Sequence, residues 1–175
     1  MPNWTENELY VKGPQADRDA FVNAAEAHHV GYDMIAGEDY SCVTQLDFNN
    51  FIPYPKHYLD QDEKAKAARK KDPKDWSVPD GFNCGGYDWC INNWGTKWNA
   101  CEITLTENKT SLKYRFDTAW SPPIKVVTAM AHMFPMLTFT LKYFEGGIGF
   151  QGRYTIKGDE IIEEFSGDYH GNRGG

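Results

Sequence analysis

The second half of the chain constrains the fold most, because its short alternating segments surround one segment of helical period. Residues 101–105 and 112–117 alternate between apolar and polar side chains on either side of a short turn, which predicts a β-hairpin. Residues 123–134 carry apolar side chains at helical spacing and stop before a proline, which predicts a helix. Alternation returns over residues 137–165 with glycine at the turns, as in a β-meander. Connections this short favour neighbouring antiparallel strands.

The first half adds strands and helices of the same size. Residues 4–12 and 42–52 are expected to be strands, and residues 15–28 a helix with His28 and His29 at its end. A second helix over residues 86–94 is expected to end at Gly95.

This order of elements predicts an α+β fold with a mainly antiparallel sheet and helices packed on one face. The hairpin–helix–meander half fits a ferredoxin-like plan, with Ser121 as the expected N-cap of the last helix.

One domain accounts for the length of 175 residues. We expect a single ferredoxin-like domain over residues 1–165 and a flexible glycine-rich tail over residues 166–175. Residues from about 56 to 80 have almost no large apolar side chains and many charges, which indicates a solvated insertion with a short helix. Trp76 is expected to attach the far end of this insertion to the core.

The formal net charge of −7 disfavours a general duplex-DNA binder, which usually carries a basic face. No apolar run is long enough to span a membrane, and the first residues lack the basic and apolar regions of a secretory signal. The expected location is the cytoplasm of a bacterial host cell.

The four cysteines, Cys42, Cys84, Cys90 and Cys101, lack the closely spaced pair that usually opens a zinc site. Reduced thiols that pack as small apolar groups are the favoured interpretation. We therefore predict no metal and no cofactor, while a cluster of Cys84, Cys90 and Cys101 stays open.

Several tryptophan- and proline-rich segments resemble the Api/YubB-like proteins of bacteriophages and plasmids, whose family domain is described as ferredoxin-like. The resemblance extends from residue 1 to about residue 160, and it implies this fold and a mobile-element origin without implying a chemistry. Where the family has cysteine after the first tryptophan, this chain has Thr5, which weakens any metal or disulfide role there. The segments are Met1–Trp4, Phe51–Pro55, Asn93–Asn99, Thr118–Pro123 and Phe134–Pro135.

Two of these motifs supply a candidate ligand-binding site that combines aromatic rings, a cation and hydrogen-bonding groups. An aromatic wall with an anion-binding end would suit a nucleotide-like ligand. The alternative is that the tryptophans cover the sheet and Lys97 extends over them. The candidate residues are Asn93, Trp94, Thr96, Lys97, Trp98, Thr118, Trp120 and Ser121.

Three functions of different classes follow. The first is a small acidic phage- or plasmid-encoded accessory protein, a non-enzymatic binding module that inhibits a host defence or nucleic-acid-processing protein. The second is a binder that sequesters a nucleotide-like small molecule in the Trp/Lys pocket. The third is single-stranded nucleic-acid binding on the sheet, with phosphate contacts from residues 64–74; the net charge disfavours it. No catalytic residues are predicted, because no triad, metal set or phosphate loop is present. The oligomeric state stays open.

Overall fold

The computed structural model describes residues 3–33 and 38–171. Its strands are β1 (Trp4–Lys12), β2 (Ala27–Asp33), β3 (Glu38–Thr44), β4 (Cys101–Glu107), β5 (Ser111–Ala119), β6 (Thr138–Glu145), β7 (Phe150–Lys157) and β8 (Glu160–Asp168). Its α-helices are α1 (Gln15–Ala25), α2 (Lys56–Lys71), α3 (Tyr87–Asn93) and α4 (Ile124–Met133). A 3-10 turn, η1 (Phe48–Asn50), and a π-helical turn, η2 (Phe82–Gly86), complete the elements.

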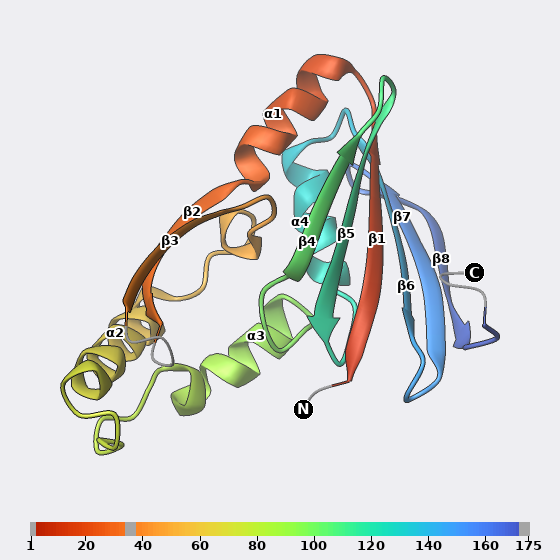
Figure 1. Ribbon diagram of the computed structural model, residues 1–175. Coiled ribbons are helices and arrows are strands. Elements are labelled where there is room, and N and C mark those ends of the chain that lie inside the picture. Colours follow the sequence, from red (N-terminus) through yellow and green to blue (C-terminus); the bar gives the residue numbers. More distant parts are fainter. Residues whose placement is uncertain (1–2, 34–37, 172–175) are drawn as a thin grey trace.

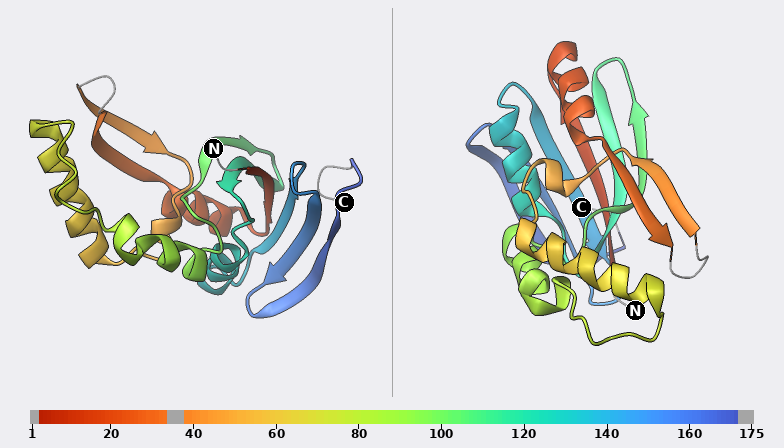
Figure 2. Two further views of the ribbon diagram at one scale, coloured as in Figure 1. Left: turned by 90° about the horizontal axis from the view of Figure 1, so that it is seen from below. Right: turned by 90° about the vertical axis from the view of Figure 1, so that its left-hand side faces the viewer.

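Six strands form one sheet in the order β4-β5-β1-β6-β7-β8, and every pairing in it is antiparallel. Strands β2 and β3 form a separate hairpin that projects away from the sheet with α2 (Figure 1). Helices α1 and α4 lie against one face of the large sheet (Figure 2). The predicted α+β class, with an antiparallel sheet and helices on one face, is confirmed.

The core forms where the apolar face of the sheet meets these helices. Strand β1 alternates strictly, so that Leu9 and Val11 are fully buried while their neighbours face the other side. Phe21 of α1 is also fully buried, and its ring meets the edges of Tyr114 and Phe139 from two different strands. The period of two in β1 and the apolar positions of α1 thus produce one continuous core.

The predicted first helix is wrong at its end. Helix α1 stops at Ala25, because Glu26 takes an extended backbone conformation and leads into β2. His28 and His29 therefore lie in a strand, where His29 pairs with Cys42 of β3. The His29 ring lies 2.9 Å from the Asp47 carboxylate, an ion pair when the imidazole is protonated. Strand pairing replaces the helix-terminus role that the sequence indicates for these histidines.

The strand predicted over residues 42–52 is correct only up to Thr44. Beyond it, the Asp47 side chain accepts the N–H of Asn49 and begins the 3-10 turn η1. Leu46 and Phe48 are both buried in this irregular segment. The alternation of apolar residues here belongs to a buried loop. A period of two residues does not distinguish such a loop from a strand.

The charged segment contains the 16-residue helix α2, which starts directly after Pro55. Trp76 does not attach this segment to the core, as its side chain is 69% exposed and lies against the Arg69 guanidinium. At the other end of the chain, β8 continues to Asp168, past the predicted start of the tail at Ser166. No helix in the described part of the chain has the length and apolar character needed to cross a bilayer.

Candidate ligand-binding site

Hydrogen bonds join the two tryptophan-rich motifs. The Thr96 hydroxyl donates to the Ala119 carbonyl oxygen at 2.9 Å, and the Ser121 hydroxyl donates to the Gly95 carbonyl oxygen at 2.5 Å. Ser121 is therefore not the N-cap of α4, which follows Pro123 and has no side-chain cap. The fully buried Thr118 donates to the Ser121 carbonyl oxygen. These three hydroxyls join the two motifs, and none of them lines the aromatic pocket described below.

Trp94 and Asn93 also have structural roles at the end of α3. Trp94 is only 4% exposed, and its indole N–H donates to the Ile52 carbonyl oxygen at 2.8 Å. Its ring packs edge-on against Phe48. The Asn93 amide donates to the Trp89 carbonyl oxygen one turn earlier in the helix. Trp94 is therefore mainly a buried core residue, which is the alternative to ligand binding that the sequence left open.

Lys97 and Trp98 remain accessible. The Lys97 ammonium lies 4.4 Å from the centre of the Trp98 ring and 5.5 Å from that of Tyr87, within cation–π range of both. Trp98 is 36% exposed and its ring centre is 6.0 Å from that of Trp4 in β1. The Lys97 ammonium group and the exposed Trp98 and Tyr87 rings therefore lie together at the surface.

Trp120 lies directly after β5 and is 41% exposed. Its backbone has a φ of +74°, a left-handed conformation that non-glycine residues rarely take. The Trp120 amide donates to the Asn3 carbonyl oxygen at 3.0 Å. The hydrogen bond links this loop to the start of β1, while the indole stays at the surface.

A pocket of about 170 Å³ opens beside Lys97 and Trp98. It contains three of the eight predicted site residues, namely Trp94, Lys97 and Trp98, while Asn93, Thr96, Thr118, Trp120 and Ser121 lie outside it. Four of its nine lining residues are aromatic. The full lining is Asn49, Tyr54, Asp62, Phe82, Cys90, Trp94, Lys97, Trp98 and Asn99.

The charged groups of this pocket are Asp62 and Lys97. One oxygen of Asp62 accepts the backbone N–H of Phe82 at 3.1 Å. Burial and the Asp62 charge raise the pKa of the Tyr54 hydroxyl above its usual range, and the same two causes raise the pKa of Cys90 to about 11. The phenol and the thiol are therefore neutral at physiological pH. The pocket thus offers one negatively charged hydrogen-bond acceptor, Asp62, one cation, Lys97, and uncharged aromatic walls.

Tyr54 and the pocket amides differ in how well their polar groups are satisfied. The Tyr54 hydroxyl is buried and has no hydrogen-bond partner within the described structure. The Asn49 amide instead donates to Asp47 and accepts the N–H of Tyr54. The Asn99 amide likewise donates to Asp47 and accepts the N–H of Phe48. The two asparagine amides are therefore engaged within the pocket wall. The Tyr54 hydroxyl, by contrast, is buried without a hydrogen-bond partner in the described residues.

Sequence reasoning missed Tyr54, Asp62 and Phe82, because they lie in or beside the segment interpreted as a solvated insertion. A signal was available in α2. Tyr58, Asp62, Ala65 and Arg69 recur every three or four residues, and Ala65 is fully buried. Such a recurrence indicates one helix face turned toward the protein even where large apolar residues are few.

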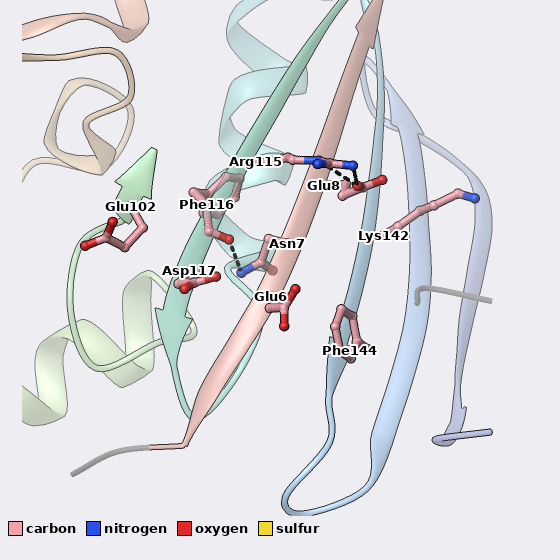
Figure 3. Close-up of a pocket in the computed structure, with 9 residues that line it drawn as sticks. All are labelled: Glu6, Asn7, Glu8, Glu102, Arg115, Phe116, Asp117, Lys142 and Phe144. Atoms are coloured by element: carbon pink, nitrogen blue, oxygen red, sulfur yellow. Dashed lines mark hydrogen bonds and ion pairs between the residues drawn. The ribbon is translucent and has the colours of Figure 1, made fainter. Parts of the chain in front are cut away.

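The open face of the sheet holds a second, mostly charged hollow of about 140 Å³ (Figure 3). Glu8, one of its lining residues, lies 2.8 Å from both Lys113 and Arg115. Burial opposes ionisation of Glu8, but hydrogen bonds from Lys113 and Tyr10 outweigh it and lower its pKa. Two of the cations on this face, Lys113 and Arg115, are therefore paired with Glu8.

Asp117 in the same hollow has the opposite shift. Burial, together with the negative charges of Glu6 and Glu102, raises its pKa. Figure 3 shows these three carboxylates on the β4–β5–β1 side and Lys142 on the other.

All four cysteines are free thiols. No group of three or more histidine, cysteine, aspartate or glutamate side chains is arranged to hold a metal ion in the described ranges. Cys90 is buried in the pocket wall, whereas Cys84 is exposed.

Comparison with known proteins identifies the scaffold. Residues 93–173 match the family model described as "Ferredoxin-like domain in Api92-like protein". The crystal structure of the protein api92 from Yersinia pseudotuberculosis is similar with a TM-score of 0.57 and 13% sequence identity, over 98% of this chain and 99% of that chain. No curated protein is similar by sequence. The ferredoxin-like fold and the family resemblance predicted from the sequence are confirmed.

Proposed function

We propose that this chain, whose residues 93–173 match the model of the ferredoxin-like domain in Api92-like proteins, is a binding protein for a small nucleotide-like ligand. The family description states a fold and no activity, so the proposal depends on the pocket. The observation that carries it is the placement of Asp62 and Lys97 around one aromatic pocket.

A planar base fits the chemistry of these walls. Exposed indole and phenol rings stack on bases without regard to sequence, and each such stack contributes about 1–3 kcal/mol. Trp98 is accessible for stacking, and the buried Trp94 and the Phe82 ring also line the pocket. A volume of about 170 Å³ accommodates a base and leaves the sugar and phosphate outside.

The two charges would orient such a ligand. One Asp62 oxygen is engaged by Phe82, and the other is available to accept an N–H from the edge of a base. The Tyr54 hydroxyl has no partner and can donate to or accept from the same edge. Lys97 extends over Trp98 at the opening, where it would meet a phosphate. The arrangement favours bases whose edge presents N–H donors.

Calorimetry and thermal unfolding with a panel of nucleotides and the matching nucleosides test this proposal. A nucleotide present at 100 times its Kd should stabilise the fold by about 2.7 kcal/mol. Lys97→Gln should weaken nucleotide binding about tenfold and leave nucleoside binding unchanged, because only the nucleotide carries a phosphate. Asp62→Asn should weaken both. Lys157→Gln, an exposed lysine on β7, is the matched control. If no nucleotide shifts the transition, or if both lysine variants behave alike, the proposal fails.

A second candidate, a module that binds a host protein, is favoured by the exposed tryptophans. Trp4, Trp98 and Trp120 are 36–41% exposed. They come from adjoining segments, since Trp4 pairs with Ala119 and contacts Trp98. Exposed tryptophan is typical of residues that dominate binding energy at interfaces. The partner would be a host defence or nucleic-acid-processing protein, and the chain a phage- or plasmid-encoded inhibitor of it.

Affinity capture from bacterial lysates, with and without phage infection, tests this candidate. A stoichiometric partner that is retained by the unaltered chain and lost with Trp120→Ala would support it. Because Trp120 lies outside the pocket, nucleotide binding should survive this change. Equal capture by both forms would contradict a role for the tryptophan surface.

A further inference from the structure

Strand β8 is an edge of the six-stranded sheet and is exposed on both of its faces. It pairs with β7 on one side only. Ile161, Ile162 and Phe165 are 53%, 56% and 46% exposed. A long exposed edge presents unpaired backbone N–H and C=O groups that can pair with another extended chain. The strand is nine residues long, which is ample for such pairing.

The opposite edge of the sheet, strand β4, combines a bulge with a side-chain contact to its backbone. Strand β4 contains a register shift between Cys101 and Thr104, with Glu102 at a φ of +51°. The Gln45 side chain accepts the backbone N–H of Leu105 in the same strand. A bulge and a side-chain cap both block strand addition. Strand β8 also has a register shift, since Thr155 pairs with Glu163 but Ile156 pairs with Ile161, and its pairing with β7 is regular from Glu163 to Asp168.

The charge of β8 determines which chain it can accept. Its nine residues include Glu160, Glu163, Glu164 and Asp168 and no lysine or arginine. Glu163 forms an ion pair with Arg153 at 3.2 Å. Glu164 and Asp168 have no ion pair within residues 3–33 and 38–171. Like charges opposite one another destabilise a strand pair and opposite charges stabilise it. A second copy of β8 is therefore disfavoured, and a basic strand is favoured.

The register shows that carboxylates face both sides of the sheet. Glu163 and Phe165 pair with Thr155 and Arg153, which flank the buried Tyr154 in β7 and so lie on the opposite face of the sheet from it. Glu164 pairs with the buried Tyr154 and so faces the helix side. A chain added at this edge would meet negative charge on either face and an exposed aromatic ring on one.

We propose that β8 is a docking edge for an extended, lysine- or arginine-rich segment of a partner protein, which adds to the sheet as a seventh strand. Backbone hydrogen bonds would supply affinity, and alternating basic residues opposite Glu164 and Asp168 would supply selectivity. This edge does not include the aromatic pocket, so the two proposals are independent.

A nine-residue peptide that alternates lysine and valine is a suitable probe. Fluorescence anisotropy of the labelled peptide should show saturable binding to the full chain, and amide hydrogen exchange should slow in β8. The same peptide with N-methyl groups on alternate residues keeps its charge and loses strand pairing, so it should not bind. A glutamate–valine peptide should not bind either.

A charge-reversed pair of variants checks the role of the edge. Glu164→Lys with Asp168→Lys should weaken peptide binding about tenfold. Asp19→Lys with Glu26→Lys, which changes net charge equally on and beside α1, should have little effect. Equal binding of the N-methylated peptide would overturn the proposal, because attraction would then be purely electrostatic. Sedimentation that shows a dimer abolished by the β8 variant would assign the edge to a second copy and would also overturn it.

Discussion

At the residue scale, Trp120 combines an exposed indole with a left-handed backbone. This conformation costs an L-residue about 1–2 kcal/mol, and glycine avoids most of that cost. Trp120→Gly should therefore be more stable than Trp120→Ala by about 1 kcal/mol, even though glycine has the more flexible unfolded chain. Denaturant unfolding of the two variants measures the difference. If the alanine variant is equally stable, the backbone relaxes once the indole is removed, and the indole itself maintains the strain.

Asp117 should make stability depend on pH. Its pKa is raised by burial and by Glu6 and Glu102, so the folded state penalises its ionised form. The penalty is absent below the unfolded pKa, grows as pH rises through the folded pKa, and is constant above it. Asp117→Asn should thus raise Tm at pH 7 and leave it unchanged near pH 3. Glu8→Gln is the opposite control, since the pKa of Glu8 is lowered and its loss should reduce Tm at pH 7. A Tm of Asp117→Asn below that of the parent at pH 7 would contradict the role of these charges.

Thiol reactivity should separate the exposed Cys42 and Cys84 from the buried Cys90. Cys42 and Cys84 are exposed, whereas Cys90 is buried and has a pKa of about 11. Because the thiolate is the reactive form, iodoacetamide at pH 8 should label Cys42 and Cys84 first and leave Cys90 unlabelled until denaturation. Mass spectrometry of digests at successive times gives the order. Early labelling of Cys90 would show that the pocket opens readily.

At the element scale, α1 is attached to the sheet mainly through Phe21. Its ring lies 5.2–5.9 Å from those of Phe51, Tyr114, Phe134 and Phe139. Phe21→Ala leaves a cavity among four rings and should cost about 3–5 kcal/mol of unfolding free energy. Val22→Ala, on the next and only partly buried position, should cost much less. Similar losses for the two variants would mean that α1 is not organised around Phe21.

Sequence patterns predicted helices and strands best where only one face of the element is buried. β1 has the predicted bounds, and α4 and the two strand pairs that flank it lie close to theirs, because each presents one apolar face with a clear period. The β2–β3 hairpin was missed because it lies outside the main sheet and its histidines carry no apolar alternation. Asp47 shows a further limit. Its carboxylate accepts the Asn49 N–H and so begins a 3-10 turn where a strand was predicted. A hydrogen bond of this kind leaves no periodic pattern in the sequence.

At the scale of the whole molecule, the pocket could be predicted only in part. Lys97 and Trp98 were identified from one motif, because a cation beside tryptophans is a local pattern. Tyr54 and Asp62 reach the same pocket from about 40 residues earlier, Tyr54 through ring contacts with Trp89 and Trp94 and Asp62 through the packing of α2 against η2. Local patterns contain no information on such contacts. The same applies to β8, whose exposure depends on the strand order of the complete sheet.

The strand order also determines which part of the chain can fold. The family match covers residues 93–173, yet β1 lies between β5 and β6 in the middle of the sheet. A fragment of residues 93–173 would lack β1 and α1, and with them the buried Leu9, Val11 and Phe21. It would also have two additional strand edges.

We therefore expect the fragment of residues 93–173 to show no cooperative thermal transition, whereas the full chain unfolds in one. A peptide of residues 1–28, which contains β1 and α1, should restore the transition when added in trans, because β1 pairs with both β5 and β6. The same peptide with Leu9→Asp and Val11→Asp should fail, since it would place carboxylates in the core. Cooperative unfolding of the fragment alone would show that β5 and β6 close the gap by pairing directly, so that the first strand is an addition to this domain and not its centre.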